Sequence, residues 1–594
     1  MSLAIPPMFI YLIGALLVPV FRGRLRQGFA LLVPILGFLS YFQLSSHEVG
    51  TVLWSPQFLD FTLELGRIDG WSLIYYNIFS LLSVIGIVYI LKENSALEFS
   101  AGLLYAGAAL GVVLSGDLIS MFIFWEMLTI GATMFILARK VQRSTKAAYR
   151  YLMVHVLGGT ILMAGIALHI YETGSIAFSQ IGLSGTGSLL IFIGFGINCA
   201  WPLLGAWLTD TYPEASIGGV IFMATYTTKT AVFVLARTFP GETALIWIGA
   251  TMAMLPIFYA VIENDLRRVL AYSLINQVGF MVVGVGLGTP LSLNGTAAHA
   301  YCHILYKALL FMSIGAVLYR TGKSKATELG GLYKSMPLTC IYCCIGAASI
   351  SAFPFFSGFV SKSMVMSAAA SGGYIVVWLV LLFASAGVFH HAGIKIPFFA
   401  FFSHDSGLRC KEAPLNMQIA MGFTAFMCIF VGSFPNAFLY KMIPEAATYE
   451  PYTVGHITDQ YALLFFSALA FTLLMRAGLY PAEVRSTNVD ADWIYRKGGR
   501  TFYGLMDRAL NSINAAAHKT FVGGFTTRLG ELAAEGPTRA LLLVMTPYWT
   551  IKGKNQEEQE ALRSTIREQV DKGAFPIGIT AWLSVLFLAL LFLF

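Results

Sequence analysis

Long blocks of apolar residues alternate with short polar stretches along the whole chain of 594 residues. A helix needs about 20 consecutive apolar residues to cross a bilayer, and counting at that length predicts about sixteen spans. These spans are expected near residues 3–21, 28–45, 70–92, 99–115, 118–137, 151–171, 186–208, 217–237, 242–262, 267–287, 294–318, 337–371, 373–393, 415–435, 459–475 and 576–594. The pattern therefore predicts an all-α polytopic membrane protein.

Two of these segments are expected to be broken inside the membrane. The segment 337–371 is too long for one straight crossing and contains Pro354, and the segment 186–208 contains Pro202. Transporters built from inverted repeats place such discontinuous helices around their ion path. The apolar pattern alone thus favours transport.

Composition and charge narrow the class further. The chain is 57% hydrophobic and only 12% charged, with a mean hydropathy of +0.72, whereas soluble domains carry about 25% charged residues. A soluble enzyme is excluded. The net charge of +7 comes from short basic loops, which explains it without a nucleic-acid partner. Alternate loops are the basic ones, so the positive-inside rule predicts both termini outside the cytoplasm.

The two ends of the chain carry further expectations. The run 3–21 is followed by Arg22, Arg24 and Arg26 instead of a cleavage site, so we expect a first helix and no removed signal peptide. Residues 480–575 mix charged runs with apolar residues at loosely helical spacing, which predicts a cytoplasmic amphipathic segment lying on the membrane. A disordered loop is the alternative. The run 576–594 then re-enters the bilayer.

Several ionisable residues lie inside apolar spans, where a charge costs about 2.5–3.5 kcal/mol. Glu126 has no neutralising neighbour in sequence, so we expect it to pair with another helix, to be protonated or to face water. A static ion pair is the alternative to a proton-carrying role. Lys229 lies near the middle of its span, too deep to reach the surface easily, and is the strongest single candidate.

A second group lies further along the chain. His299, His303 and Lys307 are spaced four residues apart, so they share one helix face over about 12 Å, as a proton wire requires. Two histidines without a third ligand do not complete a zinc site. Lys362 follows the predicted break at Pro354, where unwound backbone can line a cavity.

Two further positions are secondary. His155 is either a proton relay or a satisfied core histidine, and Lys395 is either an exit point or a lysine reaching the membrane surface. The seven cysteines are scattered, and the single CxxC at Cys340 to Cys343 has no second pair. We therefore expect no metal or redox cofactor in this chain.

Six sequence runs, in order along residues 70 to 400, resemble one family. They are Phe124-Trp125-Glu126, Trp207-Leu208-Thr209-Asp210, Thr228-Lys229-Thr230-Ala231-Val232, Arg268-Val269-Leu270-Ala271-Tyr272-Ser273, His299-(3)-His303-(3)-Lys307-Ala308-Leu309-Leu310-Phe311 and Gly358-Phe359-Val360-Ser361-Lys362. Together they resemble the antiporter-like proton channels, which include membrane subunits of respiratory complex I and the D subunit of Mrp-type sodium/proton antiporters. Tyr212-Pro213-Glu214-Ala215 looks more like the Mrp D subunit, and the charged arm with its final span looks like the lateral helix of complex I.

The resemblance implies two inverted five-helix repeats, each with a broken helix, whose buried charges form an axis across the membrane. The corresponding organisation is 1–92 (N-terminal helices), 99–237 (first half-channel), 242–400 (second half-channel), 415–475 (C-terminal helices), 480–575 (lateral segment) and 576–594 (final anchor). It also implies a prokaryotic plasma membrane and other membrane subunits as partners.

The chain departs from the family pattern at one position. Asn198 lies where the family has a lysine that pairs with the glutamate matching Glu126, and an asparagine cannot carry a proton as a cation. We expect Lys229 to become the partner of Glu126, or the first half-channel to conduct differently.

The leading hypothesis is a subunit that moves protons, in exchange for sodium or another monovalent cation, along Glu126, Lys229, His299, His303, Lys307 and Lys362. One alternative is the proton-pumping arm of a redox-driven complex, and another is the energising subunit of an inorganic-carbon uptake complex. A membrane acyltransferase that uses His303 would lack a catalytic partner.

Overall fold

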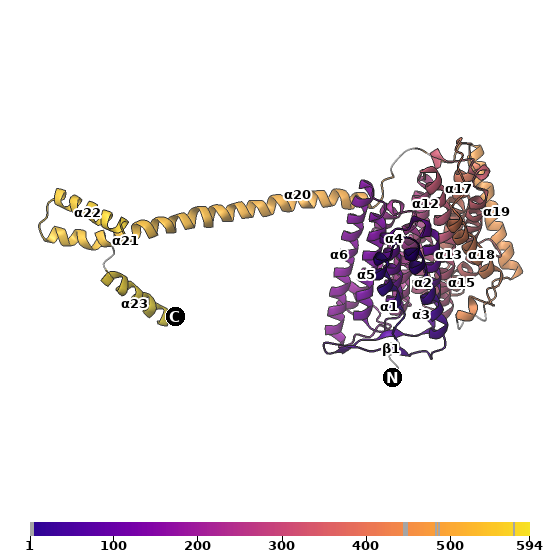
Figure 1. Ribbon diagram of the computed structural model, residues 1–594, viewed down its shortest axis with the longest axis horizontal. Helices are drawn as coiled ribbons and strands as arrows, with labels where there is room; N and C mark the ends of the chain where they lie inside the picture. Colours follow the sequence, from indigo (N-terminus) through magenta and orange to yellow (C-terminus); the bar gives the residue numbers. More distant parts are fainter. Residues whose placement is uncertain (1–4, 444–448, 482–483, 485–487, 574–576, 594) are drawn as a thin grey trace. The chain divides into compact units, whose positions relative to one another are not determined.

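The computed structural model describes residues 5–443, 449–481, 484, 488–573 and 577–593, and it divides into two compact units, Met1–Asp492 and Trp493–Phe594 (Figure 1). Each unit is described by itself. The first unit is a bundle of helices, in which twelve helices of the described residues are long and apolar enough to cross a membrane. The other four predicted spans hold shorter apolar helices: Met8–Val20, Thr186–Asn198, Pro337–Ile350 and Ile577–Leu593 of the second unit.

The helices of the first unit follow one another with short connections. They are α1 (Met8–Leu17), α2 (Gly23–Leu44), α3 (Gly70–Ile90), α4 (Ala96–Val113), α5 (Leu118–Leu137), α6 (Gln142–Thr173), α7 (Thr186–Asn198), α8 (Ala206–Thr211), α9 (Gly219–Thr225), α10 (Thr227–Thr238), α11 (Thr243–Ile262), α12 (Leu266–Leu287), α13 (Pro290–Thr321), α14 (Pro337–Ile350), α15 (Ser357–Ser371), α16 (Ile375–Val388), α17 (Lys395–Pro397), α18 (Leu415–Ser433) and α19 (Val454–Arg476). Short 3-10 helices are η1 (Val18–Val20), η2 (Leu91–Glu93), η3 (Tyr212–Glu214), η4 (Ala326–Glu328), η5 (Leu332–Lys334) and η8 (Tyr440–Met442). Two π-helices, η6 (Phe389–Ile394) and η7 (Phe398–Phe402), flank α17.

The polar connection between α2 and α3 contains β-strands that the sequence pattern did not predict. Strand β1 (Val52–Trp54) pairs antiparallel with β4 (Leu65–Arg67), and β2 (Gln57–Phe58) pairs with β3 (Phe61–Thr62). A further bridge joins Leu65 to Ser115, just before α5. These strands mark one end of the bundle, the strand face, and the connection between α5 and α6 lies at the opposite end, the arginine face (Figure 1).

The two predicted breaks are present, and they have the same backbone conformation. Between α7 and α8, Ala200 (φ 61°) and Leu203 (φ 67°) are left-handed and flank Trp201-Pro202. Between α14 and α15, Ala352 (φ 57°) and Phe355 (φ 73°) flank Phe353-Pro354 in the same way. Left-handed backbone is costly for residues with a Cβ, so each break is held by the surrounding packing.

The hydrogen bonds of the two breaks also match. Trp201 N donates to Gly196 O (3.2 Å) and Phe353 N to Ala348 O (3.0 Å), five residues back in each case. The pair α7–α8 runs from the strand face to the arginine face, whereas α14–α15 runs in the opposite direction, since Lys325, shortly before α14, is bridged to Asp265 near the arginine face. Inverted repeats require such a pair; the correspondence of all five helices stays a prediction.

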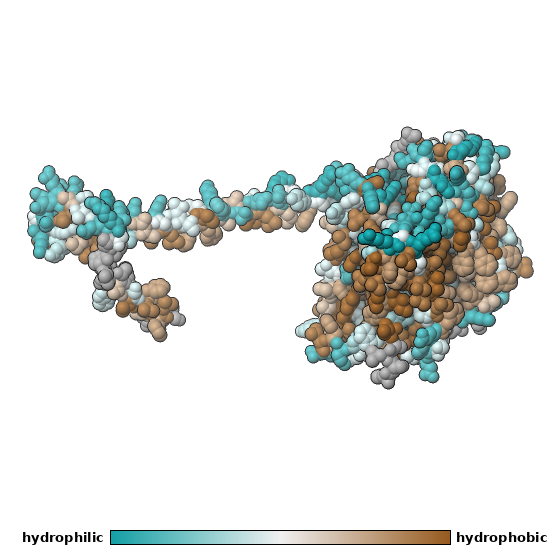
Figure 2. Space-filling view, in the orientation of Figure 1, coloured by the Kyte–Doolittle hydropathy of each residue, from teal (hydrophilic) through white to brown (hydrophobic). Residues whose placement is uncertain are grey.

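The outer surface of the first unit is apolar. Figure 2 shows hydrophobic side chains gathered in a broad band on this unit, with hydrophilic residues concentrated toward one end. Large side chains remain exposed there, for example Met153 (73%) and Leu157 (60%) on α6. A band of this kind is suited to contact with lipid.

The second unit consists of helices with apolar residues interspersed among charged ones. They are α20 (Asp492–Ala517), the π-helix η10 (His518–Phe525), α21 (Thr526–Ile551), α22 (Gln556–Asp571) and α23 (Ile577–Leu593). Phe502, Leu510 and Phe521 are exposed in this unit. The expected helical segment is therefore present, in place of the disordered alternative. Its position on the membrane stays a prediction.

Candidate functional site

Nearly all of the predicted site residues are buried in the first unit. Lys229, His299, His303, Lys307 and Lys395 are 0% exposed, and His155, Asn198 and Lys362 are at most 2% exposed. Glu126 is half-buried. Buried lysines are rare in proteins unless they have partners, so the contacts of each amine decide what the group can do.

Lys229 and Lys362 each place their amine on a carbonyl that a helix interruption has freed. The helix that carries Lys229 is interrupted at Tyr226, and Lys229 Nζ donates to Ala224 O (2.5 Å) and to Thr228 Oγ1 (3.3 Å). Lys362 Nζ donates to Ile350 O (3.1 Å), the last residue of α14. Carbonyls at the end of a helix lack intrahelical partners, so each interruption supplies an acceptor for an amine.

The predicted face of α13 is confirmed as a connected polar stripe. Lys307 Nζ donates to Ser273 Oγ (2.9 Å) and to Leu270 O (3.3 Å) on α12. At the other end of the stripe, His299 Nδ1 lies 3.1 Å from Ser361 Oγ on α15, next to Lys362. The stripe therefore runs between α12 and α15.

His303 interacts with the lysines of α10, α13 and α15. Both of its ring nitrogens are buried and have no hydrogen-bond partner among the described residues. Lys229, Lys307, His299 and Lys362 all act on it electrostatically. His303 is thus placed to link the lysine of α10 with the second half of the site.

The expected ion pair between Glu126 and Lys229 is absent from the described structure, and that prediction was wrong. Lys229 Nζ turns back onto its own helix interruption, and Glu126 Oε1 is buried without a hydrogen-bond partner among the described residues. The carboxylate lies against α6 at Gly159, where an added Cβ would be 2.1 Å from Oε1. A larger residue at this position would require the Glu126 carboxylate to shift.

Asn198, the departure from the family pattern, pairs with His155. His155 Nδ1 lies 2.8 Å from Asn198 Oδ1, while Nε2 has no partner among the described residues. The imidazole also contacts the rings of Tyr151 (4.0 Å between centroids) and Trp207 (4.5 Å). His155 is therefore half satisfied, and one nitrogen remains available for a proton.

Lys395 is held by backbone rather than at the membrane surface. Its Nζ donates to the carbonyls of Ala260 (3.3 Å), Val261 (2.6 Å) and Glu263 (2.7 Å) at the end of α11. It lies between the π-helices η6 and η7, and π-helical turns frequently mark functional sites. The alternative of a lysine that extends to the surface does not hold.

Two features of the site were missed or passed over in the sequence. His391, four residues before Lys395, is 0% exposed, with both ring nitrogens unpartnered among the described residues, and Lys307 and Lys395 act on it electrostatically. The hydroxyls of Tyr105 and of Thr227, which lies two residues before Lys229, are hydrogen-bonded to each other. Tyrosine and threonine give little signal in an apolar sequence, which is why Tyr105 and Thr227 were overlooked, whereas His391 could have been selected as a histidine in an apolar span.

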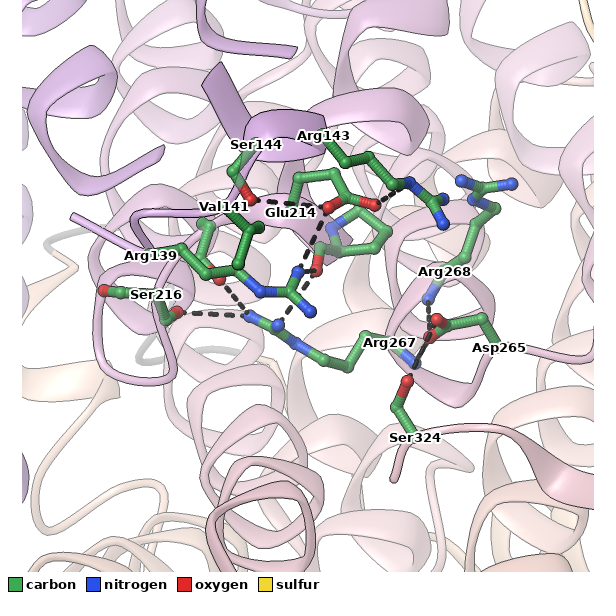
Figure 3. Close-up of polar contacts among 12 residues, drawn as sticks. Arg139, Val141, Arg143, Ser144, Glu214, Ser216, Asp265, Arg267, Arg268 and Ser324 are labelled. Atoms are coloured by element: carbon green, nitrogen blue, oxygen red, sulfur yellow. Dashed lines mark hydrogen bonds and ion pairs between the residues drawn. The ribbon is translucent and has the colours of Figure 1, made fainter. Parts of the chain in front are cut away.

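A cluster of ionic contacts at the arginine face joins the two halves (Figure 3). Arg267, at the start of α12, is 1% exposed and donates to the carbonyls of Pro213 (2.9 Å), Ala215 (3.1 Å) and Ser216 (3.1 Å). Glu214 in the same turn binds Arg139 (3.2 Å) and Arg143 (2.6 Å). The turn after the first broken helix is thereby fixed to the second half.

Among the described residues, the groups of the site are titratable side chains without a metal-binding set. Within the described ranges there is no group of three or more His, Cys, Asp or Glu side chains that could hold a metal ion. The central residues are instead amines and imidazoles, which accept and release protons. Their hydrogen-bond acceptors are carbonyls and hydroxyls rather than carboxylates.

Comparisons with known proteins show what the chain is similar to. A family model described as "NADH:quinone oxidoreductase/Mrp antiporter, TM" matches residues 115–389, a range that contains all six primary candidates. The chain is 27% identical over 497 residues to the A subunit of the Na(+)/H(+) antiporter of Alkalihalophilus pseudofirmus, covering 73% of this chain and 61% of that protein. It is 26% identical over 424 residues to hydrogenase-4 component B of Escherichia coli, covering 63% of this chain and 62% of that protein.

The fold is also found in a solved structure. The Mrp complex from Dietzia sp. DQ12-45-1b contains a chain that matches with a TM-score of 0.68 at 21% identity, covering 78% of this chain and 100% of that chain. This protein is thus a multi-pass membrane protein of that fold. The chain spans about three fifths of the length of the first curated relatives. The antiporter relative is an A subunit, so the likeness to the Mrp D subunit stays a prediction.

Proposed function

We propose that this chain is the ion-translocating subunit of a multisubunit membrane complex. Protons move along Glu126, Lys229, His299, His303, Lys307 and Lys362. The observation that carries the proposal is the buried series of lysines and histidines between α10 and α15. In the described structure none of the three lysines of this series forms an ion pair, so each amine is free to lose and regain its proton.

The electrostatics of the series supply a way to move charge in steps. Like charges repel strongly in a region of low dielectric constant. A proton on Lys229 therefore disfavours one on His303 or Lys307, and its arrival pushes the next proton onward. Carbonyl acceptors hold each amine in place in either protonation state, because an amine and an ammonium both donate hydrogen bonds.

We infer an antiporter function, in which protons exchange for sodium or another monovalent cation. The match to the antiporter protein of Alkalihalophilus pseudofirmus supports this proposal. Partners would be other membrane proteins of the complex, in a prokaryotic plasma membrane. The second unit, with its exposed apolar side chains, is suited to contact such partners or lipid.

A second candidate is the proton-pumping arm of a redox-driven complex. The similarity to hydrogenase-4 component B favours it, as does the family description that names an NADH:quinone oxidoreductase. Purification of the complex from native membranes, with mass spectrometry of its chains and an iron assay, separates the two. Iron and hydrophilic redox subunits would support the redox complex; small hydrophobic partners without iron would support the antiporter.

The test of translocation itself is Lys229→Ala. We expect the variant complex to assemble but to lose proton flux in membrane vesicles, because the amine that links the two halves is gone. Lys146→Ala on α6 is the matched control, since Lys146 is exposed. Flux retained in Lys229→Ala at the level of Lys146→Ala would refute the proposed path.

A further inference from the structure

Three hydroxyl groups from three helices meet beside the interruption that holds Lys229. Tyr105 of α4, Tyr151 of α6 and Thr227 of α10 are each at most 1% exposed. The Tyr105 hydroxyl is hydrogen-bonded to Thr227 Oγ1, and the Tyr151 hydroxyl lies close enough to interact with both. Residues 46 to 122 positions apart thus form one closed cluster of hydroxyls.

One end of this cluster, Tyr151, belongs to the face of α6 that carries His155 and contacts Glu126. Tyr151, His155 and Gly159 are spaced four residues apart and therefore lie on one stripe of α6. The ring of His155 lies 4.0 Å from that of Tyr151 between centroids. Glu126 presses its carboxylate onto Gly159 one turn further along. The stripe connects Glu126 with the hydroxyl cluster.

The other end of the cluster, Thr227, is next in sequence to Thr228, whose Oγ1 accepts a hydrogen bond from Lys229 Nζ (3.3 Å). Thr227 is two residues before Lys229 in the turn that follows the interruption at Tyr226. The amine of Lys229 folds back onto this turn, on Ala224 O and Thr228 Oγ1. The cluster therefore lies between the α6 stripe and the lysine that begins the central series.

The pattern of bonds differs from that of Tyr89 and Tyr212, two other buried tyrosines of the bundle. The hydroxyls of Tyr89 and Tyr212 donate to the backbone carbonyls of Met312 (2.8 Å) and Met223 (2.7 Å). These hydrogen bonds end on backbone carbonyls, which have no hydrogen to pass on. A hydroxyl bonded to other hydroxyls can both donate and accept, so a proton can pass along it.

Asn198 gives a second reason to expect that protons use the hydroxyl cluster. The amide pairs with His155 and cannot carry a proton as a cation, so α7 supplies no lysine between Glu126 and Lys229. A proton that crosses this half of the protein needs other titratable or hydroxyl groups. The cluster is the set of such groups found at that place in the described structure.

We propose that Tyr151, Tyr105 and Thr227 form a hydroxyl relay that carries protons between the Glu126 and His155 face of α6 and Lys229. This inference rests on the proposed function. A proton that reaches the Tyr151 oxygen displaces the hydrogen of that hydroxyl to the Tyr105 oxygen. The Tyr105 hydrogen passes to Thr227 Oγ1, and the Thr227 hydrogen passes to the amine of Lys229. Each hydroxyl ends neutral, and Lys229 gains one proton.

The experiment measures proton flux in vesicles that hold the full complex carrying Tyr105→Phe, Tyr151→Phe or Thr227→Val. The first two changes remove only a hydroxyl and keep the ring, and the third keeps the side-chain shape. We expect flux to fall by about tenfold or more, equivalent to about 1.4 kcal/mol in the barrier. Thr227→Ser should restore flux relative to Thr227→Val. Tyr89→Phe is the control, because it removes a buried hydroxyl whose bond is to backbone.

A structural defect and a lost relay give different results in heavy water. When the relay is missing, proton transfer limits the flux, so the ratio of flux in H₂O to flux in D₂O should rise above that of the unaltered complex. A defect that only lowers the amount of active complex leaves this ratio unchanged. Flux at the control level in Tyr105→Phe and Tyr151→Phe, or an unchanged ratio, would overturn the relay. Flux retained in Lys229→Ala would overturn the proposed function instead.

Discussion

Arg267 provides a quantitative test of how the two halves are held together. The guanidinium is 1% exposed and donates three hydrogen bonds of 2.9 to 3.1 Å to the carbonyls of Pro213, Ala215 and Ser216. These carbonyls belong to η3 and the turn that follows it, which the contacts drawn in Figure 3 tie to the start of α12. Arg267→Met keeps the length of the side chain and removes every donor.

The cost of this change follows from the contacts. A hydrogen bond to a charged group contributes about 1.5–3 kcal/mol, so three contribute about 4.5–9 kcal/mol before desolvation is counted. Removing the buried charge also recovers part of its desolvation cost. The partners of Arg267 are neutral carbonyls, and leaving a buried acceptor unsatisfied costs about 1–3 kcal/mol, so the three together cost about 3 kcal/mol or more. We expect Arg267→Met to lower the free energy of unfolding by that amount.

The assay is denaturant unfolding of the purified complex in detergent. Arg143→Met is the matched control, because the Arg143 side chain is 67% exposed and its partner Glu214 keeps its contact with Arg139. An exposed ion pair contributes about 1 kcal/mol or less. If Arg267→Met shifts the unfolding midpoint no more than Arg143→Met, the turn is not held by the guanidinium and the reasoning fails.

Two further predictions concern the second half of the site. Gly358→Ala places a Cβ 1.9 Å from Ser349 O, so it should separate α15 from α14 at the break and abolish proton flux. Gly28→Ala is the control, because a Cβ at that position meets open space and should leave the flux unchanged. Normal flux per assembled complex in Gly358→Ala would contradict this prediction. His391→Phe keeps a ring but removes both unpartnered nitrogens, and flux in vesicles should fall by about tenfold; flux equal to that of the unaltered complex would exclude His391 from the path.

The sequence by itself determined the class of protein and the positions of the breaks. Apolar runs of membrane-spanning length and a low share of charged residues require lipid as the solvent, whatever the packing. Pro202 and Pro354 lie in the two breaks and each removes a backbone donor, although proline alone does not decide a break, since Pro34 and Pro256 lie inside the continuous helices α2 and α11. The spacing of His299, His303 and Lys307 placed them on one face of α13, since helical periodicity is fixed by the backbone.

Only the tertiary structure decided which groups meet. The sequence predicted a pair between Glu126 and Lys229, but Lys229 turns to its own helix interruption and Glu126 lies against Gly159. The pairing of His155 with Asn198 joins two neighbouring helices, and the hydrogen bond between Tyr105 and Thr227 joins helices far apart in sequence. Inside a membrane no water satisfies a buried polar group, so a partner, where there is one, comes from whichever segment packs beside it. That choice depends on helix packing, which no local pattern along the chain records.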